Sequence, residues 1–187
     1  MTQKGKNVLS DVEIVDLLHK TADADLVLKE IMRSYQRRLY AHIRYMVQNH
    51  EDADDILQNV FVKIWKALPQ FKAESQLFTW AYRIATNECI GFLNQKKNRK
   101  RLDMQHFFVQ KTDTQTYFNT EEIAQKLEAA VEKLPTKQKL IFGLKYHQDL
   151  PYNQIAEILD LSEGALKASY HHAVKKIERQ ILTSLEL

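Results

Sequence analysis

Apolar residues recur every three or four positions along most of the chain, which is the spacing of amphipathic helices. From Leu28 to Met46 this pattern predicts one long helix, and acids at the start of 51–68 suit the first turn of a second. A third helix is predicted over 77–97. We expect these helices to pack as one domain. The apolar stripe expected to face its core from the second helix comprises Ala53, Ile56, Leu57, Val60, Phe61, Ile64, Trp65 and Leu68.

The periodic pattern stops at residues 98–120, where polar residues such as those in "KTDTQT" are scattered. We expect a flexible linker there, in which Phe107 and Phe108 are candidates for docking on a partner. Helical spacing resumes at Thr120, breaks at Leu134-Pro135 and resumes again. The predicted fold class is therefore all-α, with two small helical domains joined by a flexible linker.

The end of the chain contains two short helical patterns with almost no loop between them. In "QIAEILDLSEGALKASYHHAVKKI", residues Asp160-Leu161 separate the two helices. Pro151 suits the first turn of the earlier helix, and Ser162 is a preferred cap for the later one. This arrangement is typical of a helix-turn-helix, which places its second helix in the DNA major groove. A plain helical hairpin would give the same pattern. The positions expected to face inward are Leu166, Tyr170, Ala173 and Ile177.

Composition narrows the function classes. Among 187 residues there are only 4 Gly and 3 Pro, which argues against a turn-rich β-sandwich and a glycine-rich nucleotide-binding fold. The single Cys89 leaves no partner for an intramolecular disulfide and fits a reducing compartment. Because we find neither a signal peptide nor an apolar run near ~18 residues, we expect a cytoplasmic protein with no membrane insertion.

Charge is distributed in blocks, although the net charge is only +3. Basic residues cluster over 33–44 and in the run "KKNRKR" at 96–101, which favours an anionic polymer as partner. The acids at 51–55 could suggest a metal site, but four acids in one helical turn rarely converge on one ion. The adjacent His171 and His172 point about 100° apart on a helix. We therefore predict no metal and no cofactor.

Three segments carry a resemblance to a known family. "HEDADDILQNVFVKIWKAL" resembles region two-point-two of bacterial sigma factors of the extracytoplasmic-function (ECF) type, within the sigma-70 superfamily. "FTWAYRIATNECIGFLNQKKNRK" is similar to the promoter-melting segment of that family, and the last third of the chain is similar to its region four. The residues that meet the first motif are Asp52, Ala53, Asp55, Gln58 and Phe61.

The resemblance implies a division of the chain. Residues 26–97 would form sigma region 2, which binds core polymerase and the minus-ten element, and 121–187 would form region 4, a helix-turn-helix for the minus-thirty-five element. Residues 1–25 would be an N-terminal extension, and 98–120 the linker. Asp160 stands where the family usually has glycine at the hinge, and Ala165 where threonine is common. These departures leave the promoter sequence open.

The resemblance also implies site residues. The exposed face of the second helix would bind the clamp helices of the polymerase beta-prime subunit through Asp52, Asp55, Gln58 and Asn59. The minus-ten region would be held by Arg83, Asn87, Lys96, Lys97, Arg99 and Lys100, with Asn87 the best reader of a flipped base. Trp80 and Tyr82 are instead expected in the core. The minus-thirty-five element would be met by Ser162, Glu163, Gly164, Ala165, Lys167, Ala168, His171 and Lys175.

The function implied by the resemblance is that of an alternative sigma factor, which is not an enzyme. It would bind core RNA polymerase, direct it to specific promoter DNA and help open the minus-ten region, and an anti-sigma factor would hold it inactive. A stand-alone helix-turn-helix regulator is the alternative, although it would not need the motif around Asp55 and Gln58. A helical hydrolase using the acidic cluster is disfavoured because paired histidine and glycine elements are missing.

Overall fold

The computed structural model describes residues 8–21, 23–103 and 120–185, without the side chains of 99–103, 120–123 and 185. The chain divides into two compact units: Met1–Leu93 with Glu157–Asp160, and Asn94–Ala156 with Leu161–Leu187. Within the described ranges every regular element is a helix, which confirms the predicted all-α class. Most of the expected linker, with Phe107 and Phe108, lies outside the described residues.

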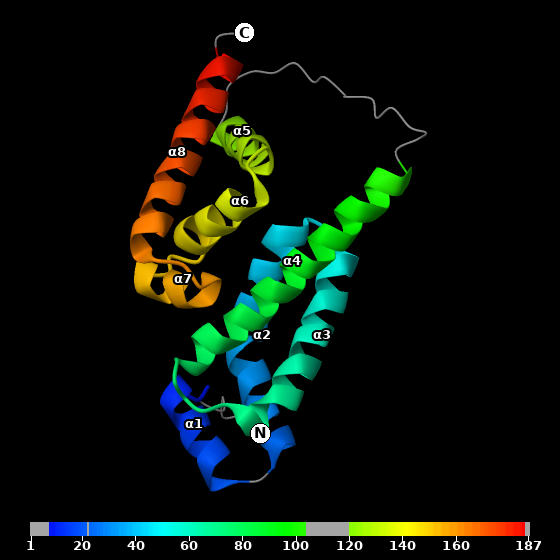
Figure 1. Cartoon of the computed structure of the whole chain (residues 1–187), viewed down its shortest axis with the longest axis vertical. Helices are drawn as coiled ribbons and strands as arrows, with labels where there is room; N and C mark the ends of the chain where they lie inside the picture. Colours follow the sequence, from blue (N-terminus) through cyan, green and yellow to red (C-terminus); the bar gives the residue numbers. More distant parts are fainter. Residues whose placement is uncertain (1–7, 22, 104–119, 186–187) are drawn as a thin grey trace, which may run out of the picture. The chain divides into compact units, whose positions relative to one another are not determined.

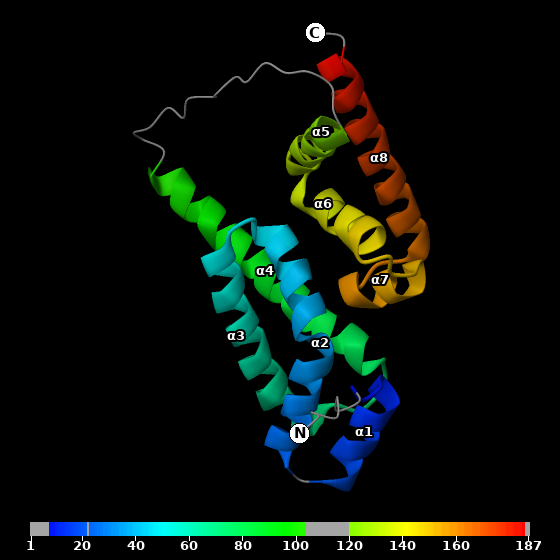
Figure 2. The ribbon, with the colours of Figure 1, turned by 180° about the vertical axis from the view of Figure 1, so that it is seen from behind.

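The N-terminal half contains four α-helices and one short turn of 3-10 helix: α1 (Asp11–Lys20), α2 (Ala24–Val47), α3 (His50–Ala67), η1 (Leu68–Gln70) and α4 (Leu77–Asp103). Helices α2, α3 and α4 lie side by side in both views (Figures 1 and 2), and α1 packs on α2. The expected helices are thus confirmed, although α4 continues past its expected end at residue 97. Helix α1 was not predicted.

The core between these helices follows the apolar spacing of the sequence. On α2, buried residues recur at every fourth position: Val27, Ile31, Tyr35, Leu39 and Ile43. On α3 and α4 the fully buried side chains include Ala53, Val60, Ile64, Ala81, Tyr82 and Cys89. The expectation for Trp65 is wrong, since this residue is 43% exposed. Its indole nitrogen donates a hydrogen bond to Asp25 Oδ1 at 2.8 Å, so Trp65 lies over the start of α2 instead of between the helices.

The C-terminal half contains α5 (Thr120–Glu132), α6 (Thr136–Phe142), a π-helical turn η2 (Gly143–His147), α7 (Tyr152–Leu159) and α8 (Glu163–Leu185). Helix α8 packs along α5 and α6. The break at Leu134-Pro135 falls between α5 and α6 as predicted. Pro151 immediately precedes α7, and its carbonyl accepts the first helical hydrogen bond from the Ile155 N–H at 3.1 Å.

Candidate functional surfaces

Helix α3 presents a polar face opposite its buried stripe. Asp55, Gln58 and Asn59 are exposed, as the resemblance implies for a partner-binding face. Asp52 is only half-buried, and its backbone N–H is bonded to the Asn49 side chain at 2.8 Å, so it belongs to the capped first turn of the helix. The carboxylate and amide groups of this face can accept and donate charge-assisted hydrogen bonds to a basic partner.

Two grooves border this polar face, and neither was predicted from the sequence. One, of about 470 Å³, is lined mainly by apolar side chains of α2 and α3: Asp25, Leu28, Met32, Gln58, Phe61, Val62 and Trp65. The other, of about 360 Å³, is lined by Met32, Arg33, Gln36, Arg37, Tyr40, Asp54 and Leu57. Gln58 therefore lies at the junction between the polar face and an apolar groove, where Trp65 and Val62 are exposed.

Helix α4 carries Arg83 and Asn87 on its exposed side, one turn apart. Lys96 and Lys97 are also exposed farther along the same helix, whereas the side chains of Arg99 and Lys100 lie outside the described set. The helix thus brings four of the six residues predicted for the minus-ten region onto exposed positions. The prediction of Tyr82 as core is confirmed, while Trp80 is only half-buried.

The opposite side of α4 is fixed on α2 by buried polar contacts. His42 Nε2 lies 3.0 Å from Thr86 Oγ1, and the Tyr82 hydroxyl donates to the Arg38 carbonyl at 3.0 Å. Burial lowers the pKa of His42 to about 4, so the imidazole is neutral near pH 7. An ion pair between Lys63 and Glu88 links α3 to α4. Arg83 and Asn87 therefore stand on a helix whose buried side is held in place.

The turn between α7 and α8 has the local geometry of a tight helix-turn-helix hinge. Asp160 adopts a left-handed conformation with φ 52°, and the Leu161 N–H donates to the Ala156 carbonyl at 3.1 Å. These two features form a helix C-cap in which aspartate takes the place usually filled by glycine. Ser162 then caps α8, since its hydroxyl oxygen accepts from the Ala165 N–H at 3.3 Å.

Helix α8 separates its buried and exposed residues as predicted. Leu166, Ala173 and Ile177 are buried, and Tyr170 is half-buried against Phe142 with ring centroids 5.9 Å apart. All the residues predicted for the minus-thirty-five element are exposed: Ser162, Glu163, Gly164, Ala165, Lys167, Ala168, His171 and Lys175.

The charged groups on α8 differ in how far they are already engaged. Lys167 Nζ pairs with Glu163 Oε2 at 3.1 Å and lies 5.5 Å from the ring of Tyr152 on α7. Lys176 donates to Gln138 Oε1 at 2.9 Å and so is used within the fold. Neither the described side chains of this helix nor those elsewhere in the described ranges form a group of three or more metal-ligating residues. None of the described helices is long and apolar enough to cross a membrane.

Both halves of the chain are similar to known proteins. Residues 31–99 match the family described as Sigma-70 region 2, and residues 120–177 match Sigma-70, region 4. The ECF RNA polymerase sigma factor SigW of Bacillus subtilis is 27% identical over 176 residues, covering 87% of this chain and 92% of that protein. The ECF RNA polymerase sigma-E factor of Haemophilus influenzae is 28% identical over 163 residues, covering 81% and 85%.

Solved structures support the same fold. The sigma factor RpoE in complex with the anti-sigma factor NepR from Bartonella quintana aligns with a TM-score of 0.63 at 21% identity, covering 82% of this chain and 95% of that chain. CnrH in complex with the cytosolic domain of CnrY aligns with a TM-score of 0.66 at 16% identity, covering 92% and 97%. With both sigma-70 regions matched in order and ECF sigma factors among its relatives, the chain belongs to the extracytoplasmic-function sigma factors of the sigma-70 superfamily.

Proposed function

We propose that this protein is an alternative sigma factor that binds core RNA polymerase, directs it to specific promoters and helps to open the minus-ten region. Two observations together carry the proposal. The chain matches both sigma-70 regions, and helices α3, α4 and α8 each expose polar residues that the resemblance assigns to binding. Its chemistry is recognition, because sigma factors are initiation factors and the polymerase performs phosphoryl transfer. It would act in the cytoplasm, where the polymerase works.

Core polymerase would bind along α3. Asp55, Gln58 and Asn59 are exposed acceptors and donors, and Asp52 marks the capped end of the same face. Charge-assisted hydrogen bonds to a basic partner are short and directional, which suits the clamp helices of the beta-prime subunit that the family uses. The neighbouring apolar groove with Trp65 would add a hydrophobic contact beside the polar one.

Promoter opening would depend on α4 and on the loop 68–76 before it. A single-stranded base stacked on an aromatic surface gains about 1–3 kcal/mol, and an amide can read the edge of a flipped base. Asn87 and Arg83 are exposed for that role. Lys96 and Lys97, with Arg99 and Lys100 further along, would hold backbone phosphates, which sets register without reading sequence.

The minus-thirty-five element would be read by the first turns of α8. Lys167 and His171 are one turn apart on its exposed side and are the proposed base-edge contacts, while Lys175 would meet a phosphate. Gly164 has open space where a side chain would be, so the backbone can approach DNA closely at that point. The remaining members of this surface are Ser162, Glu163, Ala165 and Ala168.

Run-off transcription with purified core polymerase on genomic fragments tests the proposal. The wild-type protein should direct initiation at specific sites, and Asp55→Arg should abolish initiation by weakening core binding without changing helical content. Asp16→Arg is a matched control, since it reverses an exposed acid on α1 outside the proposed face. Unchanged capture of core polymerase by Asp55→Arg would contradict the role given to α3.

A second experiment tests α8. Lys167→Ala should relax the preference at one or two base pairs, since a good base contact contributes about 1–3 kcal/mol of discrimination. Lys175→Ala should weaken all sequences alike and reduce the salt slope by about one unit. Selection from a randomised upstream element with each holoenzyme measures both effects, and an unchanged base preference for Lys167→Ala would remove Lys167 from the reading role.

The stand-alone regulator is the competing function, and gel shifts separate the two. A sigma factor whose DNA contacts are spread over two units should bind promoter duplex weakly by itself, and core enzyme should raise its affinity through effective concentration. Tight, specific binding by the free protein at physiological salt would favour the regulator instead.

An anti-sigma factor is proposed as a further partner. This rests on the resemblance and on the solved RpoE structure, which is described as a complex with the anti-sigma factor NepR. Co-purification of this protein from its native host would test for such a partner.

A further inference from the structure

The first turn of α4 contains no acidic residue. The first hydrogen bond of the helix runs from the Trp80 N–H to the Gln76 carbonyl at 3.0 Å, so the N–H groups of the preceding residues have no partner within the helix. Gln76 directly precedes the helix, whose N-terminal end carries no acidic side chain within the first turn. The positive end of this helix dipole is therefore left without compensation from its own sequence.

A carboxylate from α1 binds the first turn of α4. Asp11 Oδ2 accepts a hydrogen bond from the Phe78 N–H at 3.1 Å, which is one of the first-turn donors of α4. Its other oxygen, Oδ1, accepts from the Tyr35 hydroxyl of α2 at 2.5 Å. Asp11 thus joins three helices and brings a negative charge to the start of α4 from a residue 67 positions away in the sequence.

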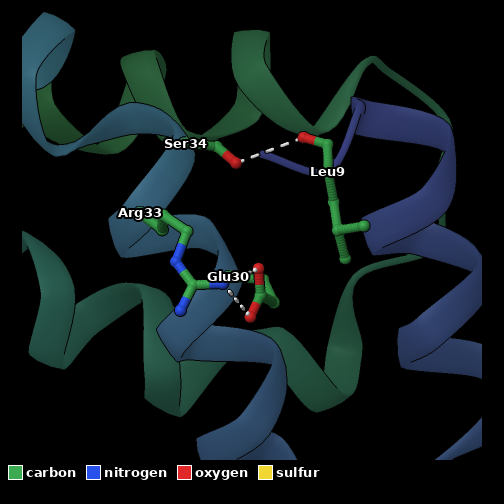
Figure 3. A network of polar contacts seen from close by, with 4 residues as sticks. All are labelled: Leu9, Glu30, Arg33 and Ser34. Carbon is green, nitrogen blue, oxygen red and sulfur yellow. Dashed lines mark hydrogen bonds and ion pairs between the residues drawn. The ribbon is translucent and has the colours of Figure 1, made fainter. Parts of the chain in front are cut away.

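The segment that carries Asp11 is itself anchored. The Ser34 hydroxyl of α2 donates to the Leu9 carbonyl at 3.2 Å, beside the Arg33–Glu30 ion pair (Figure 3). Ser10 and Glu13 form a capping box that starts α1, and Ile14 is fully buried. The position of the Asp11 carboxylate is therefore set by the way α1 packs, and not by Asp11 alone.

The side chain of Phe78 packs against residues of both α2 and α4. The Arg38 guanidinium lies 3.9 Å from the centre of the Phe78 ring, and the Tyr82 ring centroid lies 4.3 Å away. Two residues after Phe78, Trp80 contacts Phe71 with ring centroids 5.0 Å apart, which ties the loop 71–76 to α4. Within that loop Ala73 has a φ of 55°, a conformation that persists in a residue with a Cβ only when its surroundings hold it.

We propose that Asp11 is a positioning residue for promoter opening. By capping α4 from α1, it fixes the position of the loop 68–76 and of the first turn of the helix that carries Arg83 and Asn87. The inference rests on the proposed function for its consequence, but the capping contact itself belongs to the free protein. It assigns a role in DNA opening to a helix that precedes the matched sigma-70 region 2.

The test compares Asp11→Asn with Ser34→Ala. Asparagine keeps the shape of Asp11 but replaces one of its two acceptor oxygens by a donor. Ser34→Ala removes another anchor of the same segment without touching α4. Amide exchange in the free protein should be about fivefold faster at Phe78 and in the loop 71–76 for Asp11→Asn, the size expected for a lost cap. The increase should be clearly smaller for Ser34→Ala, which loosens the segment but keeps the Asp11 carboxylate.

The polymerase assays use a promoter selected with the wild-type holoenzyme. Permanganate reactivity of its minus-ten thymines should fall about fivefold with Asp11→Asn, whereas core affinity should stay within about twofold of the wild type. Run-off from a premelted template should return close to the wild-type yield, because duplex opening is no longer required. Tyr35→Phe removes the hydrogen bond from Tyr35 to Asp11 but keeps the one from the Phe78 N–H to Asp11. It should give a smaller effect in the same direction, and it replaces Asp11→Asn in these assays if that variant fails to fold.

Several outcomes would overturn the inference. Unchanged exchange at Phe78 and in the loop would do so whatever the polymerase assays show. Normal duplex opening by Asp11→Asn would do so as well, and an equal fall in core affinity and opening would mean that Asp11 only supports the fold. A wild-type protein that cannot direct initiation would instead contradict the proposed function, leaving the exchange experiment to decide the capping role.

Discussion

Helices α4 and α8 carry the residues proposed to contact DNA, yet their first turns are capped in different ways. Ser162 caps α8 from the position directly before it, and Glu163 supplies a first-turn acid. The first turn of α4 has no acid of its own and receives a carboxylate from Asp11 of α1. The first turn of α8 is therefore stabilised by adjacent residues, whereas the contact of Asp11 with the first turn of α4 depends on how α1 and α2 pack.

This difference has a consequence for how substitutions act. A change near the start of α8 alters a local cap, with a cost of about 1 kcal/mol for a lost serine cap. A change in α1 or α2 can reach the start of α4 through Asp11 and Tyr35 without altering a residue proposed to touch DNA. We therefore expect the N-terminal helices to respond as a connected group and the α7–α8 turn to respond locally.

The largest expected effects come from breaking each group of helices separately. Phe61→Ala should destabilise the N-terminal helices by about 3–5 kcal/mol, and Leu166→Ala should destabilise the C-terminal ones by about 2–5 kcal/mol, since both side chains are buried. Urea unfolding can separate them, because Trp65 and Trp80 are the chain's 2 tryptophans and both lie in the N-terminal helices.

Phe61→Ala should therefore lower the unfolding midpoint measured by tryptophan fluorescence, while Leu166→Ala should lower only the midpoint measured by circular dichroism. Val62→Ala is the control for Phe61, as a neighbouring side chain that is 50% exposed. If Leu166→Ala moved the fluorescence midpoint as far as the dichroism midpoint, the two groups of helices would unfold as one and this expectation would be wrong.

Acid should weaken the N-terminal helices through His42. Burial lowers the pKa of this imidazole from 6.5 to about 4, so the unfolded chain takes up its proton first. The stability that neutral His42 contributes is present above pH 6.5 and is lost as the pH falls toward 4, by about 3 kcal/mol.

Urea midpoints followed by tryptophan fluorescence between pH 7 and pH 4 measure this loss. His42→Gln should flatten the pH dependence, while His19→Gln, at an exposed position of α1, should leave it in place. An equally steep loss of stability in His42→Gln would assign the acid sensitivity to other groups.

The sequence predicted what depends on adjacent residues. The stripes of α2, α3 and α8, the Ser162 cap and the exposed positions of Asp55 and Lys167 all follow from helical spacing and cap preference. Trp65 was misplaced because its apolar ring suggested core, while its indole N–H found a polar partner at the helix surface.

What could not be predicted depends on contacts between distant segments. The grooves beside α3 exist because of how α2 lies against it, and no local pattern encodes them. No residue near Asp11 in the sequence indicates its contact with Phe78, which lies 67 positions away. Helix α1 itself was detectable, since Ser10 and Glu13 have the spacing of a capping box before an apolar run.

The smallest expected effect compares two helix ends that use a left-handed residue other than glycine. Gln48 ends α2 with φ 65°, and Asp160 ends α7 with φ 52°. Glycine adopts this conformation without the Cβ penalty, so Asp160→Gly should stabilise the C-terminal helices by about 0.5–1 kcal/mol. Gln48→Gly should gain less, because it also loses the bond from the Gln48 amide to the Tyr45 carbonyl at 2.8 Å. Dichroism and fluorescence midpoints measure the two changes, with Asp160→Ala as the control that keeps the Cβ. A stabilisation by Asp160→Ala equal to that by Asp160→Gly would show that the carboxylate, and not the backbone conformation, is the unfavourable feature of this hinge.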